Sequence, residues 1–111
     1  MTGLPPKATV LGSGAGALTI AAELGLAGVE VTLADFPQFG RTLEVVAGVG
    51  GVRVDCDWHG RAVAPIAITS TNPAAVVRGA PLVVISVPSF SHRVFAEMLA
   101  SVLEAGQIVL W

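Results

Sequence analysis

Charged side chains are scarce in this chain. Asp, Glu, Lys and Arg make up 13% of its 111 residues, about half of the ~25% typical of soluble proteins. Apolar residues account for 53%. Parallel strands covered by helices on both faces explain part of this deficit, because such strands are apolar on both sides. For the remainder we expect apolar surface that a C-terminal domain or a second copy in a homo-oligomer covers.

Basic residues and cysteine are also few. The six Lys and Arg residues are scattered and the formal net charge is −2, which excludes the basic patch that tracks a nucleic-acid backbone. The single cysteine, Cys56, excludes an internal disulfide and suits a reducing compartment. We therefore expect a cytoplasmic protein with no nucleic-acid partner.

A nearly uncharged stretch follows Lys7 and raises the question of an export signal or a membrane anchor. Glu23 and Glu30 interrupt it, and glycines cluster where an export signal needs leucine. We expect no membrane association. The length predicts one domain over residues 1–111, with no room for a separate substrate-binding domain.

The most informative segment is ATVLGSGAGALTIAAEL, residues 8–24. Gly12, Gly14 and Ala17 fit the G-x-G-x-x-G/A fingerprint of dinucleotide-binding βαβ units. Gly12 permits a tight turn after the strand, Gly14 lets the backbone approach a pyrophosphate, and Ala17 allows the helix to lie close to the strand. Free N–H groups and the positive dipole end at the helix start would bind phosphates without Lys or Arg.

An acidic residue ends the second strand at the position that this fingerprint expects. Asp35 is suited to accept hydrogen bonds from the adenosine ribose and would repel a 2′-phosphate, so NAD is predicted over NADP. Phe36 is predicted to lie on or near the adenine. The cofactor-binding residues predicted here are Gly12, Ser13, Gly14, Ala15, Gly16, Ala17, Asp35 and Phe36. The competing interpretation is a glycine-tolerant buried helix that binds no ligand.

Strand and helix signals alternate along the chain. Strands are predicted over 8–11, 29–34, 52–57, 62–69, 81–87 and 108–111, and helices over 15–27, 37–47, 73–78 and from 92 to a stop at Gly106. This order predicts an α/β fold: a doubly wound parallel sheet of the Rossmann-like dinucleotide-binding type, with a β-hairpin insertion. Loops 12–17, 35–38 and 87–92 would converge at the carboxyl ends of the strands.

GSGAGA near the start, ITS at 68–70 and SVPSFSH at 86–92 together resemble the N-terminal half of the opine dehydrogenases, the octopine and carboxyethyl-norvaline dehydrogenase group. The chain is more distantly similar to the NAD-binding domains of glycerol-3-phosphate dehydrogenase and ketopantoate reductase. The resemblance implies that Val87, Pro88 and Ser89 line the cofactor crevice near the nicotinamide, with His92 opening the next helix.

The resemblance also implies an activity for the full-length family, the NAD(P)H-dependent reductive condensation of an amino acid with a 2-oxo acid. The family's catalytic histidine and substrate residues lie in a C-terminal domain, so no catalytic residue is assigned in this chain. Two alternatives remain open. One is a self-standing nucleotide-binding or sensing module without catalysis. The other is the cofactor domain of an enzyme related to glycerol-3-phosphate dehydrogenase or ketopantoate reductase.

Four residues near the predicted hairpin turn raise the question of a metal site. Asp55, Cys56, Asp57 and His59 include types that bind metals, but side chains alternate between the faces of a strand, so few of them can reach one ion. We predict a solvated hairpin end and no metal site. His92, in the first turn of its helix and without a partner acid, is predicted to be a neutral residue outside the chemistry.

Overall fold

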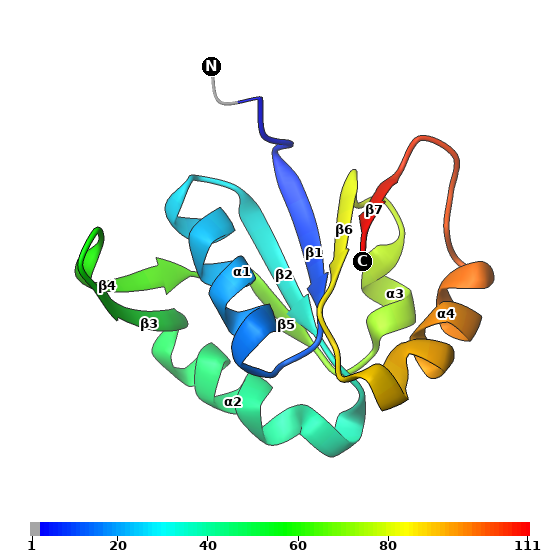
Figure 1. The fold of residues 1–111 in the computed structure, drawn as a ribbon, viewed down its shortest axis with the longest axis horizontal. Helices are drawn as coiled ribbons and strands as arrows, with labels where there is room; N and C mark the ends of the chain where they lie inside the picture. The colour runs from blue at the N-terminus through cyan, green and yellow to red at the C-terminus, as the bar shows by residue number, and fades with distance from the viewer. Residues whose placement is uncertain (1–2) are drawn as a thin grey trace.

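The computed structural model describes residues 3–111 as a parallel sheet flanked by helices, with a separate hairpin at one side (Figure 1). The elements are β1 (Lys7–Leu11), α1 (Ala15–Leu26), β2 (Glu30–Ala34), η1 (Pro37–Phe39), α2 (Gly40–Val49), β3 (Gly51–Cys56), β4 (Gly60–Pro65), β5 (Ile68–Ser70), α3 (Pro73–Val77), β6 (Leu82–Ile85), η2 (Ser89–Ser91), α4 (His92–Ala100) and β7 (Ile108–Leu110).

The main sheet has five strands in the order β5-β2-β1-β6-β7, and every neighbouring pair is parallel. Successive residues of a strand face opposite sides. Val10 therefore packs with α1 and α2 on one side of the sheet, and Leu11 packs with α3 and α4 on the other. Helices on both faces confirm the predicted doubly wound α/β fold.

The prediction of one returning strand over 62–69 is wrong, because this segment forms two strands in different sheets. β4 pairs antiparallel with β3 in the hairpin, whereas β5 pairs parallel with β2 at the edge of the main sheet. The chain passes from the hairpin to the main sheet after Pro65, which has no N–H to donate. The Ala67 N–H then donates to the Val31 carbonyl at 2.9 Å, which transfers the chain to the main sheet.

Three helices end within two residues of their predicted ends, at Leu26, Val49 and Val77, and the fourth ends earlier than predicted. Asn72 caps α3, with its side-chain oxygen accepting from the Ala75 N–H at 3.4 Å. Gly28 follows α1 with φ of 93°, and Gly50 ends α2 in the left-handed region. The last helix does not continue to Gly106 but ends at Ala100, where the Ser101 hydroxyl donates to the Met98 carbonyl at 2.8 Å.

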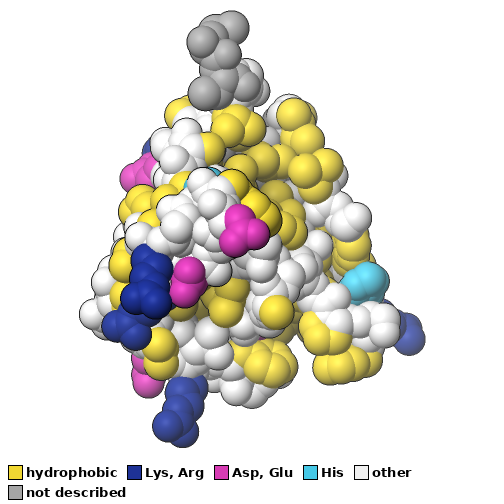
Figure 2. Space-filling view, turned by 60° about the vertical axis from the view of Figure 1, so that its left-hand side comes forward, with side chains coloured by type: hydrophobic (Ala, Val, Ile, Leu, Met, Phe, Trp, Pro, Cys, Tyr) yellow, Lys and Arg dark blue, Asp and Glu magenta, His cyan; other side chains and the backbone are white. Residues whose placement is uncertain are grey.

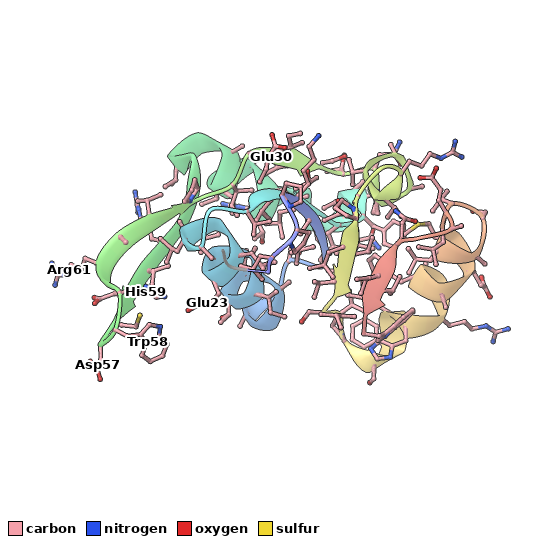
Figure 3. All side chains as sticks on the ribbon, turned by 90° about the horizontal axis from the view of Figure 1, so that it is seen from above. Glu23, Glu30, Asp57, Trp58, His59 and Arg61 are labelled. Carbon is pink, nitrogen blue, oxygen red and sulfur yellow. The ribbon has the colours of Figure 1, made fainter. Side chains whose placement is uncertain are left out.

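The hairpin β3–β4 packs against α1 and is joined to it near its tip. His59 Nε2 lies 3.1 and 3.2 Å from the two carboxylate oxygens of Glu23, and Trp58 Nε1 donates to the same carboxylate at 3.4 Å. Figure 3 shows Trp58 and His59 turned toward Glu23, with Arg61 pointing away. Within residues 3–111, no three His, Cys, Asp or Glu side chains are arranged to hold a metal ion.

Large apolar side chains remain on the surface of this fold. Ile108, Leu110 and Trp111, on or directly after the edge strand β7, are each more than half exposed, and Figure 2 shows hydrophobic side chains reaching the surface between few charged groups. Cover by another domain or subunit stays a prediction. None of the described helices is long and apolar enough to cross a lipid bilayer.

The close approach of α1 to the hairpin predicts a stability difference between two helical glycines. A Cβ at Gly25 would lie 2.5 Å from the Pro65 carbonyl oxygen, whereas one at Gly48 meets nothing within 4 Å. We expect Gly25→Ala to lower the free energy of unfolding by about 1–3 kcal/mol, and Gly48→Ala to raise it by up to about 1 kcal/mol. Urea denaturation measures both, and equal effects would contradict this packing.

The contact between hairpin and helix predicts a pH dependence of stability. The hydrogen bond from His59 lowers the pKa of Glu23 from its ordinary value of 4.5. A carboxyl group with a lowered folded-state pKa stabilises the fold above its unfolded pKa and loses that effect as the pH falls through the folded one. We therefore expect wild type to exceed Glu23→Gln in free energy of unfolding at about pH 6, and by a smaller amount at about pH 3.

Urea denaturation at both pH values measures this difference, and repeating Glu23→Gln in a His59→Ala background supplies the control. The pH-dependent gap should shrink without the imidazole, while Trp58 still donates to the carboxylate. A gap of the same size at both pH values, or one that is unchanged without His59, would show that the His59 contact contributes nothing to the pH dependence.

Candidate functional site

The Gly-rich turn after β1 rests directly on the end of β6. Gly12 has φ of 121°, and a Cβ on it would lie 2.1 Å from the Ser86 carbonyl oxygen. Ala17 is 1% exposed, with its methyl group 3.2 Å from the same Cβ position. The turn therefore has room for hydrogen at the first position and for no more than a methyl group at the last, as the fingerprint predicts.

The next glycine has the opposite environment. Gly14 is the N-cap of α1, has ordinary extended backbone angles, and is exposed, with nothing within 4 Å of its Cβ position. The first N–H groups of a helix have no partner inside it, and the helix dipole makes that end positive. No acidic side chain lies in the first turn to compete. An anion can reach this end of α1.

The acid predicted at the end of β2 lies beside this turn. Asp35 is 5% exposed. Its Oδ2 accepts a hydrogen bond from the Ser13 hydroxyl at 2.7 Å, and its Oδ1 accepts from the Phe36 N–H at 2.8 Å. Both Ser13 and Asp35 are predicted site residues, but the bond between them is not predicted, because the two residues are 22 positions apart in the chain.

The aromatic residue that follows Asp35 is engaged elsewhere. The ring of Phe36 packs against Phe95 of α4, with 4.8 Å between ring centroids, in the apolar cluster on the α3 and α4 side. A contact between Phe36 and adenine stays a prediction. Phe39, the last residue of η1, does line the cavity described below.

The third loop, 87–92, follows Ser86 at the same edge of the sheet. The Ser86 N–H donates to the Leu11 carbonyl at 3.0 Å, which extends the β1–β6 pairing beyond the strands. His92 opens α4 as expected. Its Nε2 lies 3.2 Å from the Val87 carbonyl oxygen, and its ring meets Trp111 edge-on at 5.5 Å. These contacts give His92 a role in holding the loop.

A cavity of about 190 Å³ lies where the three loops meet. Its lining consists of Ser13, Gly14, Asp35, Phe39, Thr42, Val87, Pro88, Ser91 and Phe95. Of the predicted site residues, it brings together Ser13, Gly14, Asp35, Val87 and Pro88. Gly12, Ala15, Gly16, Ala17, Phe36 and Ser89 do not line it. Among residues 3–111, no Lys or Arg contributes to this lining.

Four of the lining residues were not predicted: Phe39, Thr42, Ser91 and Phe95. Phe39 and Phe95 belong to the apolar patterns of the predicted helices, which indicate packing positions, and Phe95, which is 1% exposed, does pack as well as line the cavity. Ser91 alone had a usable signal, its place inside the segment SVPSFSH.

A larger hollow of about 510 Å³ lies on the hairpin, between Arg53 and Arg61. None of the side chains that line it is buried, so it offers an open surface rather than a shaped site. The smaller cavity is the better candidate because it combines a buried carboxylate, an accessible helix N-terminus and three converging loops.

No protein-family model matches this sequence, and no curated protein matches it. Solved structures do. The chain is similar to a ketopantoate reductase from Ralstonia eutropha JMP134, with 28% identity and a TM-score of 0.74 over 95% of this chain and 33% of that one. It is also similar to octopine dehydrogenase in a structure with NADH and pyruvate, with 21% identity and a TM-score of 0.77 over 95% and 28%.

A third similar structure is 2-dehydropantoate 2-reductase from Methylococcus capsulatus, with 17% identity and a TM-score of 0.69 over 93% of this chain and 32% of that one. The chain thus spans about a third of the length of these proteins. The likeness confirms the Rossmann-type fold and the predicted resemblance to octopine dehydrogenase and ketopantoate reductase.

Replacement of each glycine of the turn by alanine is expected to lower the free energy of unfolding by very different amounts. Gly12→Ala would place a methyl group on the Ser86 carbonyl in a backbone region that alanine avoids, and we expect a loss of about 3 kcal/mol or more in the free energy of unfolding. Gly14→Ala should cost at most about 1 kcal/mol, since only the N-cap preference changes. Chemical denaturation of both variants measures this, and similar losses would show that the turn does not rest on β6.

Proposed function

We propose that this chain is the NAD-binding unit of an oxidoreductase. One observation carries the proposal: the ends of β1, β2 and β6 meet at a single cavity, where the uncovered Gly14 lies beside the buried carboxylate of Asp35. The solved structures with this fold include octopine dehydrogenase bound to NADH, which supports a nicotinamide dinucleotide as the ligand.

Each part of the cavity suits one part of a dinucleotide. The open N-terminus of α1 at Gly14 supplies backbone N–H groups for a pyrophosphate. Asp35 supplies carboxylate oxygens that accept from ribose hydroxyls. Val87 and Pro88 provide an apolar wall on the nicotinamide side. Bound there, the cofactor would supply hydride transfer, and the chain's residues would bind and orient it.

NAD is favoured over NADP on electrostatic grounds. A 2′-phosphate beside the Asp35 carboxylate would bring like charges together in a partly dry site. No Lys or Arg among the described residues lines this cavity to offset that repulsion. The proposal is therefore a preference for NADH with weaker acceptance of NADPH.

Two reactions are proposed for a protein that combines this unit with a substrate-binding domain. The first is the reductive condensation of an amino acid with a 2-oxo acid, in line with the resemblance to octopine dehydrogenase. The second is the reduction of a 2-oxo acid, which is favoured by the 28% identity to a ketopantoate reductase, against 21% for octopine dehydrogenase. Both use the same cofactor unit, so the binding residues proposed here serve either reaction.

Cofactor binding is the direct test. We expect a titration with NADH to quench the fluorescence of Trp58 and Trp111 saturably, and NADPH to bind more weakly, with calorimetry as the second measurement. Gly14→Val should weaken NADH binding by about 100-fold or more, because its side chain would fill the space of the pyrophosphate.

Gly48→Val, a matched substitution at an open position in α2, should leave binding unchanged. If wild type bound neither dinucleotide, the proposed function would be wrong. If Gly14→Val bound NADH as tightly as wild type, the site would lie elsewhere.

A further inference from the structure

One hydrogen bond connects the Gly-rich turn after β1 to Asp35, the residue that follows β2. The Ser13 hydroxyl, on the turn after β1, donates to Asp35 Oδ2 at 2.7 Å. The second oxygen of the same carboxylate accepts from the Phe36 N–H at 2.8 Å. Ser13 and Asp35 both line the cavity, and Asp35 is 5% exposed. The carboxylate is therefore held at both oxygens before any ligand arrives.

The two bonds constrain how the carboxylate can respond to a ligand. An ionised carboxyl group offers about four lone-pair positions, and Ser13 and Phe36 occupy one on each oxygen. The remaining positions can accept from the two hydroxyls of a ribose. The terminal torsion of aspartate is otherwise broad, so without the Ser13 bond the carboxylate could rotate away from a 2′-phosphate.

We infer that Ser13 is a positioning residue that sets the choice between NADH and NADPH by holding the Asp35 carboxylate against the 2′ position of the ribose. This inference rests on the proposed function. Ser13 acts through Asp35, and the charge-assisted hydrogen bond between them is of the stronger kind. The fixed carboxylate favours a diol and disfavours a phosphate at one and the same place.

The test compares cofactor preference in wild type, Ser13→Ala, Ser13→Thr and Ser101→Ala, with dissociation constants for NADH and NADPH from calorimetry. Ser101 supplies a matched control, because its hydroxyl bonds the Met98 carbonyl outside the cavity. We expect Ser13→Ala to narrow the preference for NADH by about tenfold, the change associated with one charge-assisted hydrogen bond. Ser13→Thr, which keeps a hydroxyl, should retain most of the preference, and Ser101→Ala all of it.

The ratio of the two constants separates positioning from folding. If Ser13→Ala weakened both cofactors equally, the ratio would stay unchanged and the inference would be wrong, while the proposed function stood. If wild type bound neither cofactor, both would be wrong. Should Ser13→Ala fail to fold, Ser13→Cys, which keeps the size of serine but replaces its hydroxyl with a weak thiol donor, gives the same ratio test against Ser13→Thr.

Discussion

The contact between the Gly-rich turn and the end of β6 is the constraint on which the rest of this structure depends. Only hydrogen fits on Gly12 above the Ser86 carbonyl, and this close approach brings the turn against the third loop. On its other side, the Gly12 N–H donates to the Ala34 carbonyl at 2.9 Å. The turn is thereby held between the ends of β2 and β6, and the three loops of the cavity meet because of it.

The scarcity of charged side chains in the sequence extends to the cavity. Among the described residues, Asp35 is the one ionisable group that lines the cavity, together with hydroxyl, apolar and backbone surfaces. A helix N-terminus provides partial positive charge without a basic side chain, so a dinucleotide can be bound by backbone groups. Because no Lys or Arg in the described part of the chain lines the cavity, the Asp35 carboxylate dominates the electrostatic potential there. The bond from Ser13 holds that carboxylate in place.

The hairpin and the cavity lie at opposite ends of α1. The hairpin joins α1 through Glu23, late in the helix, whereas the cavity lies at the start of the same helix. The close approach at Gly25 keeps α1 and the hairpin in contact, so the helix is supported at one end and left open at the other. A change at the Glu23 contact should therefore lower the free energy of unfolding and leave the cavity at the start of α1 unchanged.

Local features could be predicted from the sequence because local sterics and hydrogen bonding determine them. The turn at Gly12, the cap at Asn72 and the acid after β2 each follow from the preferences of a few adjacent residues. The transfer of residues 62–69 between sheets, the packing of Phe36 on Phe95 and the bond from Ser13 to Asp35 were decided by the tertiary structure alone. Each of these depends on which distant segments of the chain come into contact, and the conformational preferences of adjacent residues do not determine those contacts.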